Sequence, residues 1–351
     1  MKEQGKKIIS YIMNNLEKNP KDISKLTAKK FGITRQAVNR YFRKLIKDGL
    51  IETTGKTRGH VYKFKEIVNE DCVFPLTPDL EEDRVWRQNI KHLINPLSQN
   101  IFDICHYGFT KMFNNAIDHS EGKSVLVKVL ITAAYIKIVV MDNGIGIFKK
   151  ITNELGLEDH RHAILELAKG KLTTDPERHT GEGIFFTSRI FDIFSIYSGE
   201  LFFEHKAPKD DWLIETKEYN KLGTTVLMQI STHSKSTTKG IFDKYASEED
   251  DYGFTKTHVP VSLLKHGQDK LISRSQAKRL LARFDRFNEV SLDFRGVKTI
   301  GRAFADEIFR VFRNQNPNIK IVSFGANKEV ERAINRALGE SQESKNKDVK
   351  N

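Results

Sequence analysis

Two polar runs in the middle of the chain carry side chains suited to binding a charged ligand. Asn115 lies in the run NNAIDHS, and its amide can offer a carbonyl oxygen to Mg²⁺, a cation that prefers oxygen ligands. Asp142 opens the run DNGIGIF, and its carboxylate can accept a hydrogen bond from an amino group. These two runs therefore supply a candidate metal ligand and a candidate amine acceptor.

Glycines accompany the candidate ligands. Gly144 and Gly146 follow Asp142 and allow the backbone to turn tightly. Gly181 and Gly183 stand in HTGEGIFF at the start of an apolar helix, where free backbone N–H groups suit phosphate. Ordinary turns would explain either of these pairs taken alone.

The elements that must position these residues alternate between helix and strand. Apolar residues at helical spacing, such as Ile101, Phe109 and Ala116, predict a helix that ends in NNAIDHS. The stretches VLVKVLI and YIKIVVM predict two strands, the second leading into DNGIGIF. Further strands are expected around 199–205, around 212–215 and in LGTTVLMQI (222–230).

In this order the four segments resemble the Bergerat-fold ATPases, the GHKL group that includes gyrase, the Hsp90 chaperone, histidine kinases and MutL proteins. The resemblance covers residues 98–231 and implies an α/β sandwich that binds ATP and Mg²⁺. It assigns Asn115 to Mg²⁺, Asp142 to the adenine amino group and Thr225 to the adenine pocket. The nucleotide-binding set it implies is Asn115, Asp118, His119, Asp142, Gly144, Gly146, Gly181, Glu182, Gly183 and Thr225. For Asp118 and His119, capping or packing at the helix end is an equal alternative.

The sequence departs from this family at one position. Hydrolysing members carry a glutamate four residues before the magnesium asparagine, where it activates water, and this chain has Lys111 there. A protonated lysine cannot act as a general base, although it can pair with a phosphate oxygen. The resemblance therefore implies ATP binding more firmly than hydrolysis, and turnover is expected to be slow or absent.

The charge of the chain is concentrated at its N-terminus. The formal net charge is +12, and residues 1–65 carry 17 Lys/Arg against 5 Asp/Glu, so the other 286 residues are neutral with 41 of each. One basic module on a neutral body indicates a polyanionic partner.

The basic module shows three predicted helices and a β-wing. Thr34 is expected to cap the third helix and Asp22 the second, and two short strands are expected at 50–53 and 60–64. The run GITRQAVNRYFRKLIKDGLI resembles the recognition helix of a winged helix-turn-helix. The expected DNA contacts are Arg35, Gln36, Asn39, Arg40 and Arg43 on this helix, with Lys56 and Arg58 in the wing. The alternative is a protein–protein module with a solvated basic helix.

The C-terminal segment alternates again between helix and strand. A helix over 275–287, the strand EVSLDF, the helix RAFADEIFRVFRN and the strand NIKIVSF predict a small parallel sheet, and Asn327 is expected to cap a last helix. The stretch LDFRGVKTIGRAFADEIFRVF resembles a STAS-like domain of unknown function. STAS-type anti-sigma-factor antagonists carry a phosphorylatable serine after the equivalent turn, where this chain has Gly301, Arg302 and Ala303. Docking of a partner protein or of a second copy of the chain is therefore expected instead.

These assignments predict a multidomain α+β protein. The expected order is a winged helix (1–66), a helical connector with a helix over 79–93 (67–97), a Bergerat-fold domain (98–231), a linker (232–258), a STAS-like α/β domain (259–340) and a disordered tail (341–351). No apolar run suits a membrane span, and Cys72 and Cys105 are too few for a disulfide framework, so a cytoplasmic protein is expected.

The function these observations favour is a DNA-binding transcription regulator that is switched by ATP and Mg²⁺. Two alternatives remain open: a serine/threonine protein kinase of the anti-sigma-factor type, and a DNA-remodelling GHKL ATPase that dimerises on ATP.

Overall fold

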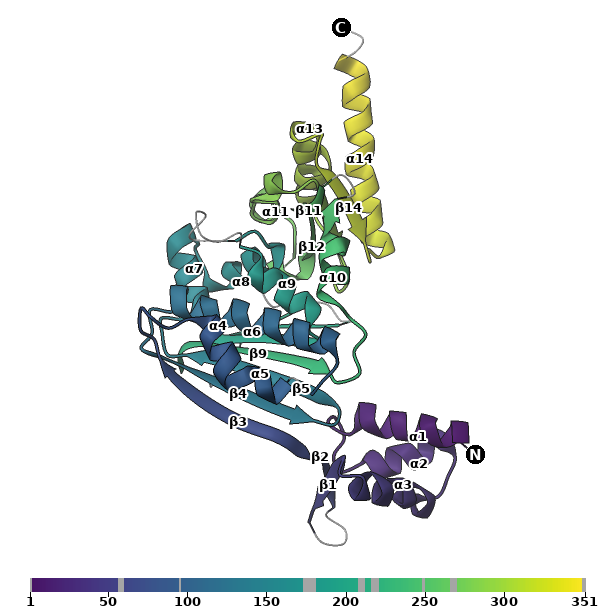
Figure 1. Cartoon of the computed structure of the whole chain (residues 1–351). Coiled ribbons are helices and arrows are strands. Elements are labelled where there is room, and N and C mark those ends of the chain that lie inside the picture. Colours follow the sequence, from purple (N-terminus) through teal and green to yellow (C-terminus); the bar gives the residue numbers. More distant parts are fainter. Residues whose placement is uncertain are drawn as a thin grey trace. The chain divides into compact units, whose positions relative to one another are not determined.

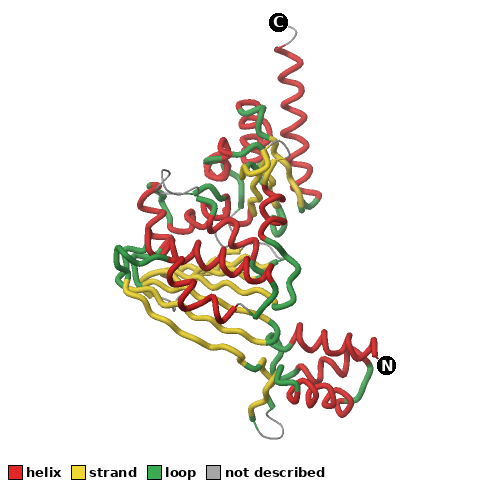
Figure 2. Tube along the Cα trace, viewed as in Figure 1, coloured by secondary structure: helices red, strands yellow, loops and turns green. Residues whose placement is uncertain are grey.

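The computed structural model describes residues 2–55, 60–94, 96–172, 181–207, 212–215, 221–247, 250–265 and 270–348. By its internal contacts the chain divides into two compact units. The first unit holds residues 1–72, 127–138 and 229–234, and the second holds the remainder. Figure 1 labels the helices and strands, and Figure 2 colours them by type.

The first unit begins with three helices and a two-stranded antiparallel wing. These elements are α1 (Lys2–Asn15), α2 (Ile23–Phe31), α3 (Arg35–Lys47), β1 (Ile51–Thr54) and β2 (Val61–Phe64). Apolar residues from all of them form one core, in which Ile12, Val38 and Phe42 are almost fully buried. Phe64 also packs edge-on against Tyr135, with ring centroids 5.9 Å apart. The predicted order of helices and wing strands is therefore the observed one.

The two predicted caps of this region have different outcomes. The hydroxyl of Thr34 accepts a hydrogen bond from the backbone N–H of Ala37 at 3.2 Å, which confirms the expected cap of α3. Asp22 is the N-cap residue of α2, as predicted, but its side chain makes no capping hydrogen bond. Its backbone (φ −104°, ψ −4°) lies in the helical region, whereas a capping side chain needs the extended conformation.

A seven-stranded sheet forms the centre of the chain. Its order is β3-β4-β5-β9-β6-β7-β8. The strands are β3 (Glu66–Pro75), β4 (Ser124–Thr132), β5 (Tyr135–Asp142), β6 (Ile193–Gly199), β7 (Leu201–Lys206), β8 (Trp212–Glu215) and β9 (Lys221–Ser231). Every second residue of β5 is buried, from Ile136 to Asp142, so one face of the sheet is packed.

Helices form the second layer of this centre. They include α6 (Gln99–His119), α7 (Ile147–Leu155), α8 (His160–Lys169) and α9 (Gly183–Ile190), and Figure 1 shows α6 running along the sheet. Gly108 of α6 allows a close approach, because a Cβ there would lie 2.4 Å from the ring of Phe191 and 3.1 Å from Sδ of Met228 in β9. The resulting helix layer on a sheet is consistent with the expected α/β sandwich.

The connector predicted over 67–97 is only partly helical. Glu66–Pro75 form the edge strand β3, where a helical connector was expected. Most of its residues are exposed, so it lacks the apolar alternation that marks a strand with one buried face. The expected helix over 79–93 is present as α4 (Glu82–Val85), a π-helical turn (Trp86–Ile90) and α5 (Lys91–Ile94).

The segment predicted as a linker over 232–258 also contains regular structure. It forms α10 (Thr238–Tyr245), β10 (Ala246–Ser247) and β11 (Asp250–Phe254), and β10 pairs with β11. Tyr245 and Phe254 pack against Phe185 of α9 at ring-centroid distances of 5.0 and 4.4 Å. The polar composition of the segment predicts a linker, but Tyr245 and Phe254 are buried, and their packing stabilises regular structure in this segment.

The C-terminal domain (β12 to α14, residues 256–348) has the predicted parallel sheet, but with three strands, of which the first, β12, lies mostly within the segment predicted as a linker over 232–258. Its strands β12 (Lys256–Pro260), β13 (Glu289–Asp293) and β14 (Lys320–Phe324) run in this order. The helical segments are 3₁₀ (Val261–Leu264), α11 (Arg274–Leu281), 3₁₀ (Phe284–Arg286), α12 (Arg302–Asp306), π-helical (Glu307–Phe312), α13 (Arg313–Gln315) and α14 (Lys328–Asp348). Oδ1 of Asn327 accepts from the backbone N–H of Glu329 and Val330 at 2.9 and 3.0 Å, which confirms the predicted cap.

The tail expected to be disordered from 341 continues α14 as far as Asp348. Glu, Gln and Lys are good helix formers, so a charged segment without apolar residues can extend a helix that is already anchored by packing. None of the helices in the described ranges is both long and apolar enough to cross a membrane.

Candidate functional site

Asp142, at the end of β5, joins two separate parts of the central domain. Its side chain is 7% exposed. Its Oδ1 accepts hydrogen bonds from the backbone N–H of Gly144 at 2.9 Å and of Thr224 at 3.1 Å. Burial raises the pKa of Asp142, and these hydrogen bonds oppose the rise. The carboxylate is therefore a fixed acceptor at the point where β5, the following loop and β9 meet.

Two glycines let the backbones around Asp142 approach one another. A Cβ at Gly144 would lie 1.9 Å from the carbonyl oxygen of Ser120, the residue that follows α6. A Cβ at Gly223, whose φ is +88°, would lie 2.0 Å from the carbonyl oxygen of Asp142. No other residue fits either place without a shift of the backbone. Gly146, also a predicted site residue, directly precedes α7.

Thr224, and not the predicted Thr225, contacts the Asp142 loop. Besides its N–H bond to Asp142, its hydroxyl accepts from the backbone N–H of Ile147 at 2.9 Å. Thr224 is buried and Thr225 is half-buried. Successive side chains of a strand point to opposite faces, so only one of two adjacent threonines can face the loop. The GTT motif therefore predicts the segment of β9 that meets the Asp142 loop, but it does not predict which of the two threonines faces the loop.

The C-terminal half of α6 carries the other predicted ligands. Asn115 is half-buried and Lys111, one turn earlier on the same face, is exposed. Asp118 is exposed and His119 is half-buried. The backbone N–H of Ile145 donates to the carbonyl oxygen of Ser120 at 2.9 Å, so the end of this helix is bonded to the loop that follows Asp142. The structure thus brings together the two polar runs identified in the sequence.

The glycines at the start of α9 lie beside α6. A Cβ at Gly183 would be 3.5 Å from Cβ of Lys111. Lys111, Glu182 and Gly183 line a cavity of about 560 Å³ together with Tyr107, whose pKa is raised by burial. Gly181 has a φ of +71°, and its carbonyl oxygen accepts from the N–H of Leu172 at 3.2 Å.

These positions suit a nucleotide in three respects. Asp142 offers an acceptor for an amine, Asn115 carries an amide oxygen suited to Mg²⁺, and the first turn of α9 carries N–H groups for phosphate. In the described part of the chain, no cluster of three or more His, Cys, Asp or Glu side chains could hold a metal ion.

The predicted DNA contacts form a surface on α3. Arg35, Gln36, Asn39, Arg40 and Arg43 are all exposed. Val38, Phe42 and Leu45 of the same helix are buried in the core, so the polar residues occupy the opposite face. This geometry allows several long side chains to reach a groove or a phosphate backbone together. Lys56 and Arg58 lie outside the described residues.

The C-terminal domain does not carry the hydroxyl of an antagonist serine after β13. Gly301 is at the N-cap position of α12, and Arg302 and Ala303 begin that helix. Asp293 at the end of β13 binds Arg295 at 2.6 Å and lies 3.3 Å from Nε2 of His258. These contacts, which the sequence analysis did not identify, tie the ends of β12 and β13 together.

Comparison with protein families identifies the two ends of the chain. A family described as winged helix-turn-helix DNA-binding matches residues 1–52. A family described as a STAS-like domain of unknown function matches residues 276–331. Neither match reaches the central sheet, and no curated protein matches the chain. The winged helix and the STAS-like domain are thereby confirmed, and a winged helix of this kind indicates DNA binding.

Proposed function

We propose that this chain is a DNA-binding transcription regulator whose central domain binds ATP and Mg²⁺ and thereby changes the affinity for DNA or for a partner protein. The observation that carries the proposal is the buried carboxylate of Asp142, held between Gly144 and Thr224 and joined through Ser120 to the helix of Asn115. This arrangement supports the Bergerat-fold resemblance of residues 98–231 with contacts that the motifs alone do not provide.

In this proposal each group of residues binds one part of the nucleotide. Asp142 accepts a hydrogen bond from the adenine amino group, and the amide oxygen of Asn115 binds Mg²⁺. Gly181, Glu182 and Gly183 lie at the start of α9, where backbone N–H groups favour an anion. Thr224 replaces Thr225 as the threonine expected at the adenine pocket, because it contacts Asp142.

Lys111 favours binding without rapid hydrolysis. It is exposed on α6, one turn before Asn115, at the position where the resemblance expects a glutamate base. Its ammonium group pairs with phosphate but cannot remove a proton from water while it stays charged. ATP is then a ligand that shifts a conformational equilibrium, which requires different affinities for the two states.

The test measures DNA and nucleotide binding by the same full-length protein. Fluorescence polarisation with a random-sequence duplex, at low salt, gives the DNA affinity with and without ATP and Mg²⁺. Calorimetry gives the ATP affinity. The proposal requires measurable ATP binding, and a switch of DNA binding requires a DNA affinity that changes when ATP is added. Equal DNA affinities would refute the switch of DNA binding, and a failure to detect ATP binding would refute the nucleotide site.

The match of residues 276–331 to a STAS-like domain favours a second candidate function, that of a serine/threonine protein kinase of the anti-sigma-factor type. Lys111 and the glycine, arginine and alanine at 301–303 weigh against it, because base and acceptor hydroxyl are both replaced. Transfer of label from γ-labelled ATP to a partner protein would support the kinase. DNA-stimulated hydrolysis would instead support the remodelling ATPase.

A further inference from the structure

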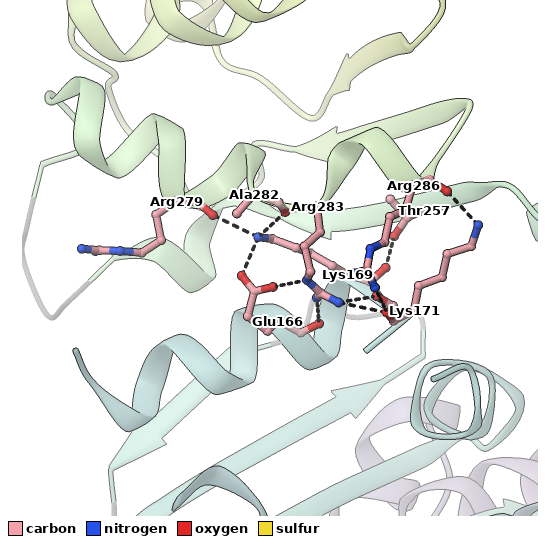
Figure 3. Close-up of polar contacts among 9 residues, drawn as sticks. Glu166, Lys169, Lys171, Thr257, Arg279, Ala282, Arg283 and Arg286 are labelled. Carbon is pink, nitrogen blue, oxygen red and sulfur yellow. Dashed lines mark hydrogen bonds and ion pairs between the residues drawn. The ribbon is translucent and has the colours of Figure 1, made fainter. Parts of the chain in front are cut away.

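A buried ionic network joins the end of α8 to the segment that follows α11 in the C-terminal domain (Figure 3). Lys169 is 0% exposed, and its Nζ lies 2.6 Å from Oε1 of Glu166. The same ammonium donates to the carbonyl oxygens of Arg279 and Ala282, both at 3.0 Å. Its three donors are therefore all used, two of them by the C-terminal domain.

Arg283 binds the same glutamate from the C-terminal side. Its Nε lies 2.6 Å from Oε2 of Glu166, and its Nη2 donates to the carbonyl oxygen of Glu166 at 2.9 Å. Its Nη1 donates to the carbonyl oxygen of Lys171 at 3.0 Å. The backbone of Arg283 has a φ of +66°, which is uncommon for a residue other than glycine, and these contacts hold it there.

The residues after Lys169 are held by further contacts with the C-terminal domain. The hydroxyl of Thr257 in β12 donates to the carbonyl oxygen of Lys169 at 2.6 Å. Nζ of Lys171 donates to the carbonyl oxygen of Arg286 at 2.7 Å, and Nη1 of Arg286 donates to that of Lys171 at 3.0 Å. Figure 3 shows these contacts beside the Glu166 network.

This junction lies next to the candidate phosphate-binding residues. The N–H of Leu172 donates to the carbonyl oxygen of Gly181 at 3.2 Å, and a Cβ at Gly181 would lie 2.5 Å from the backbone of Leu172. In α9, Nη2 of Arg189 donates to the carbonyl oxygens of Ala168 and His258 at 3.2 and 3.4 Å. Gly181 and α9 are therefore hydrogen-bonded to the end of α8 and to β12.

We infer that Glu166, Lys169 and Arg283 are positioning residues that carry a nucleotide-dependent change from Gly181–Gly183 to the STAS-like domain. The inference rests on the proposed ATP site. The physical reason is that a buried network of charges is stable only when every member is paired, so it favours discrete arrangements over gradual deformation. The STAS-like domain is then the part of the chain that responds to nucleotide and presents the response to a partner.

The experiment is hydrogen exchange of the full chain with and without ATP and Mg²⁺. Arg283→Gly keeps the left-handed backbone accessible and leaves Glu166 paired with Lys169. A second variant, Glu166→Gln with Lys169→Met, removes the Glu166–Lys169 pair together, so that Lys169 is not left buried without its carboxylate. Arg283 then keeps only its bonds to the carbonyl oxygens of Glu166 and Lys171. Lys320→Met is the matched control, because it removes an exposed ion pair to Glu289, 3.0 Å long, within the same domain.

In the unmodified protein and in Lys320→Met, ATP is expected to slow exchange both at 181–190 and at 274–286. In the two junction variants the slowing at 181–190 remains and the slowing at 274–286 is lost. If the junction only stabilises the fold, the two variants would raise exchange at 274–286 in the absence of ATP, but ATP would still slow exchange there. That result, or slowing confined to 181–190 in the unmodified protein, overturns the inference while the ATP site stands. If ATP slows hydrogen exchange in no segment and calorimetry detects no ATP binding, both the inference and the proposed ATP site are refuted.

Discussion

At the scale of single residues, the candidate nucleotide site depends on the carboxylate of Asp142. Its Oδ1 already accepts two backbone hydrogen bonds, from Gly144 and Thr224, which fix its orientation before any ligand arrives. Such preorganisation lowers the entropic cost of binding. The residue has a structural role, and in the proposed site it also has a recognition role; substitution can separate the two.

Asp142→Asn is expected to keep the fold and weaken ATP binding. An asparagine whose oxygen accepts from the two N–H groups turns its amino group toward the ligand, so the adenine amino group loses its charged acceptor. Hydrogen bonds to charged groups contribute about 1.5–3 kcal/mol, so the Kd for ATP should rise at least about tenfold. Calorimetry measures the change. Asp103→Asn, an exposed carboxylate on α6 bonded to Gln99, is the control and should leave the Kd unchanged.

The raised pKa of Asp142 predicts acid sensitivity of nucleotide binding. Burial favours the protonated form, so protonation on acidification begins above the ordinary aspartate pKa of about 3.9. The ionised carboxylate is the better acceptor, and ATP affinity should therefore fall as the pH decreases through the raised pKa. A pH series of ATP titrations measures this loss. The same series on Asp142→Asn should lack that component, and an identical pH profile would contradict the assignment.

Lys111→Glu tests why the chain is expected to turn over ATP slowly. The substitution places a carboxylate one turn before Asn115, where a general base typically contributes about 10²–10⁴-fold. Phosphate release should rise from a low level if the rest of the site is intact. Lys111→Gln, which removes the charge without supplying a base, should show no such rise. Rapid hydrolysis by the unmodified protein would contradict the role given to Lys111.

At the scale of elements, α3 presents a polar face because Val38, Phe42 and Leu45 point into the core. Arg40→Ala is expected to weaken binding to a random-sequence duplex and to reduce the slope of log K against log salt by about one if the contact is to a phosphate. Polarisation titrations at several salt concentrations measure both quantities. Lys298→Ala, an exposed cation of the C-terminal domain, should change neither.

Two other elements owe their structure to packing. In α10 and β11 a polar stretch is ordered by Tyr245 and Phe254, which pack on Phe185. The edge strand β3 is held by pairing with its neighbour in the sheet, although most of its side chains are exposed. One segment packs on α9 and the other pairs within the central sheet, so neither is an irregular connector.

At the scale of the whole molecule, the central domain and the C-terminal domain share a buried ionic junction. Glu166 is the anion between two cations, Lys169 and Arg283, at 2.6 Å from each. Substitution of Glu166 alone leaves two cations, Lys169 and Arg283, buried without the carboxylate that they bind. Such charges make the junction a point on which the stability of the second unit depends.

Glu166→Gln is therefore expected to be strongly destabilising. Breaking a buried ion pair by removing one partner costs about 3–5 kcal/mol, whereas removing both partners costs much less. Adding Lys169→Met to Glu166→Gln should recover part of the lost stability. Urea unfolding of the three proteins measures the difference. A double variant less stable than Glu166→Gln would show that Lys169 contributes through its bonds to Arg279 and Ala282.

Much of the architecture was predictable from the sequence because it depends on neighbouring residues. Helical spacing of apolar side chains, the caps at Thr34 and Asn327, and the parallel βα alternation all arise from local backbone geometry. The basic charge of residues 1–65 is likewise a property of composition, and it identified the region that the winged-helix family matches.

Other features were decided only by the tertiary structure. The chain alone does not distinguish Thr224 from Thr225, because the face of β9 that meets Asp142 depends on the register of a strand distant in sequence. Lys169 and Glu166 have the spacing of an ordinary surface pair, and they are buried because a domain more than a hundred residues later packs over them. Local sequence sets which elements form, whereas long-range packing sets which side chains are buried and which of them meet.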